Sequence, residues 1–574
     1  MNKHQRVSST VLVTLLSMSG YAVAQESNQP GSGPSSNTQQ ATPNLQSSGS
    51  TKKNIQVKEL ASPKVTIGQA GMAYAINRIK FQGNISIHES LLQSVIKSSK
   101  YGSLGKLTLP QMQEICDVVT NYYRQHDFLV AKAVIPEQDI TDGSLVIQVL
   151  EGRLDGIQVK ASSSEKQERI KEILSAQIPD GSVLQKDHIY RAINIAGEST
   201  GEVVKVNLEA SKKIGGTNID VQAEELPTYY GSIVGDNFGS ASVGKNNYTG
   251  NLGFNSLLSL GDKLNLSVGT TNHPELSRRY DLTYQVPVGN DGWSIGTRIW
   301  RSTYQIGSDF SSVQPYGYSQ AMGVYASYAF TRSENAKSDW RVGYNHVNLT
   351  ENYLSGSIAN PRQTNVVWTD LGGSYADNDL STAASTTWLI NLTAGNIAVD
   401  PSSYNYQTQQ YSGGYGIFSY QYGREQVINS GISIFGNIRG QTASKNLDSY
   451  QKFNLGGPVA VRAYPVGEVT GDDAVLGTVE LRYTEPLDFD GKGGYARIAA
   501  FYDSAWAKIN HNLLSAQTTP NSAVLAGYGL ELNVGIGKNL VGRIYAAKES
   551  SSNYGASHID KSKSRVGLQV SLGF

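Results

Sequence analysis

The sequence has a single cysteine and, beyond its first residues, no long apolar run. Cys116 is the only cysteine in 574 residues, so no disulfide can form within the chain. No stretch after the N-terminal region approaches the ~20 apolar residues that a transmembrane helix needs. Only helices and closed barrels satisfy their backbone hydrogen bonds in lipid. If the mature chain lies in a membrane, it must therefore cross it as a β-barrel.

The motifs of enzymes and metal sites are also missing. The eight histidines show no metal-ligand spacing, and neither a Gly-x-Ser-x-Gly elbow nor a phosphate-binding loop is present. Asp472-Asp473 resembles a calcium-loop fragment but lacks the other oxygen ligands, so we expect a solvated loop tip there. Lys plus Arg and Asp plus Glu both number 48, which gives no reason to expect a nucleic-acid partner. We expect no enzymatic activity, no cofactor and no metal.

The N-terminus has the three parts of a secretory signal. Lys3 and Arg6 supply a positive start, an apolar run covers residues 11–16, and Ala22-Val23-Ala24 is a small-x-small cleavage site. We predict that residues 1–24 are a signal peptide cleaved after Ala24. The mature chain is therefore expected outside the cytoplasm.

A mixed α+β module then occurs twice. Residues 25–73, rich in Ser, Gln, Asn, Gly and Pro at their start, are predicted to be a flexible linker. The order strand, helix, helix, strand, strand follows in 74–152 and again in 153–226, which indicates a repeat. Thr108 begins a capping box, and Cys116 lies on the apolar face of that helix as an expected core thiol. The predicted elements are 76–81, 85–97, 108–125, 130–135 and 144–150, then 154–159, 165–175, 187–196, 203–208 and 218–224.

From residue 227 the helical patterns give way to alternating strands. The clearest strand is 564–574, in which apolar residues alternate with polar residues or glycine and the chain ends on Phe574. Strict period-two alternation gives one apolar and one polar face. A soluble sandwich alternates as well, so the pattern alone leaves both folds open. The export signal and the aromatic terminus favour an outer-membrane barrel, with lipid outside and a wet lumen inside.

Four motifs, in this order along the chain, point to a known family. They are Phe81-x-Gly83-Asn84; Asp236-Asn237-x-Gly239 with Leu260-Gly261-Asp262-x-Leu264; Leu455-Gly456-Gly457-Pro458 with Val461-Arg462-Ala463-Tyr464; and Phe501-x-Asp503-x-Ala505. With them, the chain after about Tyr74 resembles the Omp85 superfamily, and within it the transporters of two-partner secretion. That resemblance implies a mainly β fold: two α+β POTRA domains ahead of a transmembrane barrel of about sixteen antiparallel strands.

The resemblance also assigns roles to residues. Residues 227–574 would form the barrel, with about 22 residues per strand and loop, and a loop at about 445–477 would fold back inside it. Arg462 on that loop would pair with Asp503 in the lumen as a latch, and Phe574 would be the assembly signal. The implied site residues are Gly456, Gly457, Val461, Arg462 and Tyr464 on the loop, Phe501 and Asp503 on the receiving strand, and Phe81, Gly83 and Asn84 in the first POTRA domain.

The implied function is export of one large partner protein from periplasm to cell surface. The POTRA domains would capture the unfolded N-terminal secretion domain of that partner. Outer-membrane lipid, the barrel-assembly machinery and periplasmic chaperones would be further partners of a monomer. The alternatives are a barrel-assembly insertase of the same superfamily and, less well supported, a passive porin with a periplasmic appendage.

Two features depart from the family pattern. Ala463 stands where the arginine motif usually has glycine. Either the backbone at this position is not left-handed, or the tip of the loop differs locally from that of the family. Relatives also carry a plug helix at the N-terminus. Residues 25–50 are rich in Ser, Gly and Pro and are poor helix formers, so the sequence disfavours a plug helix here and leaves its presence open.

Overall fold

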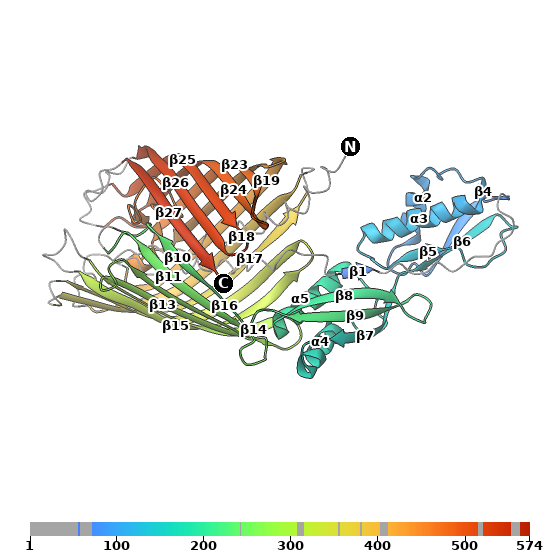
Figure 1. Ribbon diagram of the computed structural model, residues 1–574, viewed down its shortest axis with the longest axis horizontal. Helices are drawn as coiled ribbons and strands as arrows, with labels where there is room; N and C mark the ends of the chain where they lie inside the picture. The colour runs from blue at the N-terminus through green and yellow to red at the C-terminus, as the bar shows by residue number, and fades with distance from the viewer. Residues whose placement is uncertain are drawn as a thin grey trace.

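The chain forms two small α+β domains and one closed barrel, with the first domain farthest from the barrel (Figure 1). The computed structural model describes residues 55–57, 72–240, 243–306, 315–353, 356, 358–378, 382–401, 411–514, 520–552 and 563–574. The predicted signal peptide and most of the segment 25–73 lie outside the described residues. Among the described helices, none is long and apolar enough to cross a membrane.

The first domain packs two helices against a three-stranded sheet in the order β3-β6-β5. Helix α3 begins with the predicted capping box, in which Gln111 Oε1 accepts from the backbone N–H of Thr108 at 2.8 Å. Cys116 is buried on its apolar face, and burial raises the pKa of the thiol to about 12. The elements are β2 Ala73–Ala75, β3 Arg78–Gln82, α2 Glu89–Lys97, β4 Lys106–Thr108, α3 Leu109–Gln125, β5 Lys132–Val134 and β6 Ser144–Leu150.

The second domain repeats the order of the first and adds one strand. Its sheet runs β1-β8-β9-β7, and the added strand β1 comes from Ile55–Val57. These three residues fall in the segment predicted to be flexible, so that prediction is wrong for them: Ile55 is buried in the apolar core of this domain. The other elements are β7 Arg153–Lys160, α4 Ser164–Gln177, α5 Lys186–Thr200, β8 Glu202–Ala210 and β9 Gly216–Glu225.

The barrel has sixteen antiparallel strands, and β27 pairs with β10 to close it, which confirms the predicted fold class. Neighbouring strands follow one another in the chain with one exception: a long segment with two short strands of its own separates the neighbours β20 and β23. The strands are β10 Tyr229–Asp236, β11 Asn247–Asn255, β12 Lys263–Thr271, β13 Ser277–Val288, β14 Trp293–Gln305, β15 Tyr316–Arg332, β16 Ala336–Tyr353, β17 Ile358–Asp377, β18 Ala384–Val399, β19 Gly413–Asn429, β20 Ile432–Ala443, β23 Asp473–Phe489, β24 Lys492–Lys508, β25 Ser522–Ile536, β26 Leu540–Ser552 and β27 Ser564–Gly573.

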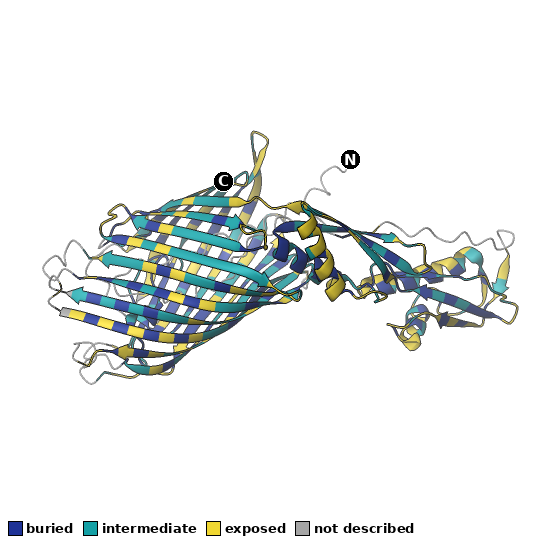
Figure 2. Cartoon of the chain, turned by 90° about the horizontal axis from the view of Figure 1, so that it is seen from below, coloured by how far each residue is buried: buried dark blue, intermediate teal, exposed yellow. Residues whose placement is uncertain are grey.

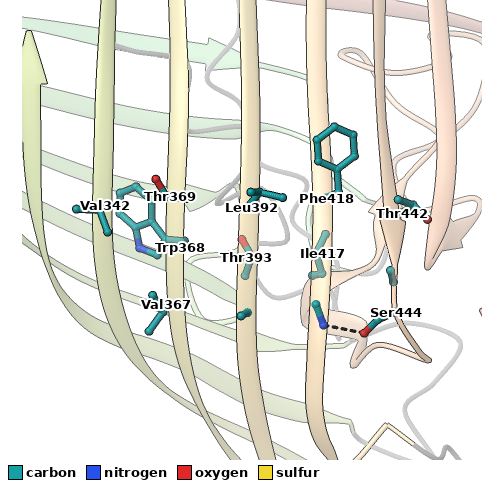
Figure 3. Close-up of a pocket in the computed structure, with 13 residues that line it drawn as sticks. Val342, Val367, Trp368, Thr369, Leu392, Thr393, Ile417, Phe418, Thr442 and Ser444 are labelled. Carbon is teal, nitrogen blue, oxygen red and sulfur yellow. Dashed lines mark hydrogen bonds between the residues drawn. The ribbon is translucent and has the colours of Figure 1, made fainter. Parts of the chain in front are cut away.

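Alternate side chains of each strand point away from the lumen. Many of these outward side chains are apolar, so the outer wall is apolar. Figure 2 shows the resulting alternation of exposed and less exposed residues along the strands. Val367, Leu392 and Phe418 are exposed on this wall and line a hollow of about 620 Å³ (Figure 3). Gly416 also lines the hollow, and its backbone N–H donates to Ser444 Oγ at 2.8 Å. A surface of this composition suits lipid acyl chains.

The closing seam includes Asp236 and Asn237 of one sequence motif and the C-terminal Phe574. Ser232–Asp236 pair with Gln569–Gly573, and Phe574 exchanges two backbone hydrogen bonds of 3.0 Å with Gly231. Asn237 lengthens the seam, because its Oδ1 accepts from Leu568 N at 2.8 Å. The amide side chain therefore continues the ladder beyond the last strand residue.

Helix α5 of the second domain docks on the turns at one end of the barrel. Arg191 donates to Ala329 O at 2.6 Å, and Arg332 lies 2.8 Å from Glu198. Gly261, in the turn between β11 and β12, has φ +67°, and a Cβ there would lie 2.1 Å from Ser199 O. Only glycine fits at this contact, so the motif around Gly261 joins the barrel to the second domain.

The ion pairs of this docking surface fix the charge of Glu198. Burial by itself would raise the pKa of this carboxyl group. The positive charges of Lys337 and Arg332 outweigh that effect and lower the pKa to about 2. Glu198 is therefore ionised at any physiological pH.

Candidate functional site

The segment between β20 and β23 folds into the barrel and forms the candidate site. This lumen loop, residues 444–472, contains the short helix η5 Ser449–Gln451 and the paired strands β21 Phe453–Asn454 and β22 Thr470–Gly471. The sequence placed the loop at about 445–477. In the structure Asp473 already begins β23, so the last five of those residues belong to the barrel wall.

Two glycines let the lumen loop turn back on itself. A Cβ on Gly456 would lie 2.1 Å from Pro465 O, and a Cβ on Gly457 would lie 2.8 Å from the side chain of Val466. Gly457 also has φ +114°, a backbone conformation that other residues rarely adopt. The pair therefore permits a close fold that brings Val461 beside Leu455, with an N–H···O distance of 2.9 Å.

Arg462 projects from this fold onto the barrel wall. Its Nε and Nη2 donate to the two carboxylate oxygens of Asp503, each at 2.8 Å, and its backbone N–H donates to Asp503 Oδ2 at 3.1 Å. Nη1 lies 2.8 Å from Glu480 and 3.0 Å from Glu531. The guanidinium also stacks 3.4 Å above the ring centroid of Phe501. One loop residue thus binds three neighbouring strands, β23, β24 and β25.

This contact is dry, which differs from the wet lumen expected from the sequence. Arg462 is 4% exposed and Asp503 is 0% exposed. The loop packs against small wall residues, because an alanine-rich surface lets its backbone approach closely. The shared apolar cluster consists of Phe238, Phe453, Leu455, Ala460, Val461, Ala463, Tyr464, Val469, Ala474, Leu476, Phe501, Ala505, Ala507, Ala523, Leu525, Tyr545 and Ala547.

The three carboxylates belong to a larger, charge-balanced network. Arg482 lies 2.7 Å from Glu480 and 2.6 Å from Glu425, and Arg543 lies 2.8 Å from Glu531. Arg497 completes the set at 3.9 Å from Glu425. Four arginines and four carboxylates therefore meet on the inner face of β19 and β23–β26, with Arg462 as the member supplied by the loop. Each carboxylate of this set has an arginine partner, which offsets the cost of burying its charge.

The structure resolves the question raised by Ala463. Its backbone does not have positive φ. Instead, its side chain packs against the wall at Gly527, where an added Cβ would lie 2.4 Å from the Ala463 Cβ. The small residue at this contact is supplied by the wall.

The other predicted residues of the loop and its receiving strand lie in the same region. Tyr464 is buried, and its hydroxyl donates to Ser551 O on β26 at 2.9 Å. Phe501 is buried beneath Arg462, while its neighbour Tyr502 points outward and is 49% exposed. These positions follow from the alternation of β24.

A second anchor, at the base of the lumen loop, was missed by the sequence reasoning. Asp448 forms an ion pair with Arg362 on β17, with 2.7 Å between Asp448 Oδ2 and Arg362 Nε. Arg362 Nη2 also lies 2.9 Å from Glu351 Oε1. Lys452 lies 2.9 Å from Asp472. Asp472 is fully buried, so the prediction of a solvated tip there is wrong. No sequence motif marks these residues. Arg362 and Asp448 are 86 residues apart in the chain, and Lys452 and Asp472 stand at opposite ends of the loop.

The remaining predicted site residues lie away from the lumen. Phe81 is buried in the first domain, Gly83 has φ +78°, and a Cβ on Gly83 would lie 2.4 Å from Val149 O. Asn84 donates to Ile87 O at 3.1 Å. These three residues shape the turn ahead of α2, and Phe574 is at the barrel seam.

Comparison with known proteins agrees with this architecture. A family model described as haemolysin secretion/activation protein ShlB/FhaC/HecB matches residues 215–534, and a ShlB-type POTRA domain model matches residues 74–152. The heme/hemopexin transporter protein HuxB of Haemophilus influenzae strain 86-028NP is 25% identical over 438 residues, or 75% of this chain and 76% of HuxB. The outer membrane transporter CdiB of Dickeya dadantii is 22% identical and covers 72% of this chain and 73% of its own.

A solved structure shares the fold. CdiB from Escherichia coli superposes with a TM-score of 0.67 at 19% identity and covers 90% of this chain and 93% of its own.

Proposed function

Since the chain belongs to the ShlB/FhaC/HecB family of haemolysin secretion/activation proteins, we propose that it captures one large unfolded protein in the periplasm and moves it through its barrel to the cell surface. The chain is an outer-membrane transporter of two-partner secretion, with its POTRA domains in the periplasm.

The lumen loop carries the proposal. Arg462 holds the loop against three strands through a buried, charge-balanced network. Burying such ions costs desolvation energy that a purely structural apolar contact would avoid. We interpret the network as a latch: it fixes the loop at rest, and a polypeptide that separates Arg462 from Asp503 releases it. A passive pore has no need of such a latch.

Capture is assigned to the small domains at the periplasmic end. Their sheets are narrow, and the edges of narrow sheets can accept an extended chain as an extra strand. The proposed mechanism uses no nucleotide and no catalytic residue. Folding of the exported partner outside the cell would make the transfer favourable.

The test compares the proteins of the culture medium with and without the gene for this chain. We expect one large protein to disappear from the medium while the outer-membrane proteins stay unchanged. Loss of many outer-membrane barrels would instead indicate an insertase. An unchanged medium with altered uptake of small solutes would indicate a porin, and either result would contradict the proposal.

A further inference from the structure

A strand from the beginning of the described chain occupies one edge of the second domain. Ile55, Gln56 and Val57 pair in parallel with Val206, Asn207 and Leu208 of β8, and Figure 1 shows β1 lying beside β8. The chain then forms the whole first domain before it returns to build the second. Strand β1 is therefore an addition from outside the repeat.

Strand β1 is held far less firmly than the other neighbour of β8. It makes three residue pairs, whereas β9 pairs with β8 over its full length from Glu202 to Ala210. Ile55 enters the apolar core, but Gln56 and Val57 are exposed. The remaining strands β7, β8 and β9 with helices α4 and α5 already form a packed module with its own core. Removing β1 would expose a sheet edge without dismantling the domain.

We propose that this edge of β8 is the docking site for an extended segment of the exported polypeptide, and that Ile55–Val57 occupies it at rest as a displaceable placeholder. The inference rests on the proposed function and names its capture site. The placeholder defines the ligand: an extended segment parallel to β8, with an apolar side chain at the position of Ile55 and tolerance for polar residues at the next position.

The location of this edge suits delivery to the barrel. Strand β9 leads directly into β10, and Leu226 between them donates to Gly201 O at 3.1 Å, beside the start of β8. Helix α5, which precedes β8, docks on the barrel turns. A segment bound along β8 is therefore held by the domain that is attached to the barrel.

While β1 competes for the edge, the apparent affinity for the partner equals the intrinsic affinity multiplied by the fraction of molecules whose edge is open. If about one molecule in ten is open at rest, releasing the strand tightens binding about tenfold. Ile55→Asp removes the one buried anchor and should have this effect. Val57→Asp changes an exposed residue of the same strand and should leave binding nearly unchanged.

The decisive experiment locks the placeholder in place in the full-length protein. A Gln56→Cys/Asn207→Cys pair joins β1 to β8 on their solvent side, and buried Cys116 does not interfere. The control pair, Asn207→Cys/Asp220→Cys, joins β8 to β9 and leaves the edge open to β1. We expect the oxidised lock to abolish secretion of the protein identified from the culture medium, the reduced lock to restore it, and the control to secrete in both states.

A photoreactive residue at position 207, in the Ile55→Asp background, tests the contact directly. It should form an adduct with the exported protein, while the same probe at the exposed Gln158 of β7, on the opposite edge of the sheet, should not. Normal secretion with the lock fully oxidised, or adducts only at position 158, would overturn this inference and leave the proposed function intact. An unchanged culture medium after deletion of the gene would overturn the proposed function itself.

Discussion

Arg462 is the residue on which the lumen loop depends most, because it meets three carboxylates in a site without water access. In Arg462→Ala, Asp503 loses its bidentate partner, while Glu480 and Glu531 keep Arg482 and Arg543. Breaking a buried pair costs about 3–5 kcal/mol, so the barrel should unfold at a lower temperature and secretion should fall sharply. Heat-modifiability on gels and the amount of protein in the medium measure the two effects.

Arg298→Ala is the matched control for that substitution. Arg298 donates to Asp281 at 2.9 Å, but both residues belong to the barrel wall. Its loss should leave secretion near wild type.

The double variant Arg462→Ala/Asp503→Ala should be no worse than either single variant, because coupled residues are not additive. Additive defects, or normal secretion by both single variants, would refute the latch.

The contact between Ala463 and Gly527 allows a test by exchange. Gly527→Ala places a Cβ 2.4 Å from the Ala463 Cβ, so the loop should be pushed from the wall and secretion should drop severalfold. Ala463→Gly in the same chain removes the opposing methyl group and should restore most of the activity. Secretion by the wild type and the two variants, at equal barrel levels in the membrane, measures this. Failure of the second change to rescue would place the clash elsewhere.

At the level of elements, the seam between β10 and β27 is the joint that closes the barrel. Deleting Phe574 removes the two backbone hydrogen bonds to Gly231 and an exposed aromatic side chain at the lipid face. We expect less heat-modifiable barrel in the outer membrane, since this terminus is also the predicted assembly signal. Phe574→Tyr keeps the backbone and the ring and should assemble normally. Unchanged levels after the deletion would rule out this role.

The docking of α5 on the barrel should depend on pH in a defined direction. The pKa of Glu198 is lowered to about 2, so its contribution to stability is complete above about pH 4.3, the value of an unperturbed glutamate, and is lost as the pH falls toward 2. Thermal unfolding of the wild type and of Glu198→Gln should therefore differ at pH 6 and converge near pH 2. A difference that is the same at both values would show that the carboxylate charge is not involved.

At the scale of the whole molecule, capture and passage are expected to be separable. A chain without residues 74–225 should still insert its barrel, because the sixteen strands close on themselves, but it should secrete nothing. Residues 51–226 should form a soluble folded fragment that binds the exported partner. Outer-membrane fractionation, the culture medium and binding to the purified fragment check these outcomes. Secretion that continues after the deletion would exclude a capture role for the small domains.

The sequence by itself determined the class of fold, because its signals are local. The alternation of 564–574 gives an outward apolar face, the capping box at Thr108 starts α3 where it was predicted, and the repeated element order marks two similar domains. Each signal depends on side chains that are close in the chain. The contact of Arg462 with Asp503 was an implication of family resemblance, and no periodicity would have revealed it.

Only the tertiary structure determined which other residues surround the contact of Arg462 with Asp503 and how deeply it is buried. Glu531 lies 69 residues from Arg462, and Asp448 lies 86 residues from Arg362, so no local pattern joins them. The dryness of the site follows from an alanine-rich wall that several strands build together, and Ala463 fits because Gly527 faces it. Likewise, Ile55–Val57 became a strand only because β8 offered an unpaired edge. A short polar-flanked segment cannot order itself, since its few hydrogen bonds do not offset the entropy of fixing the chain until a sheet edge supplies the partners.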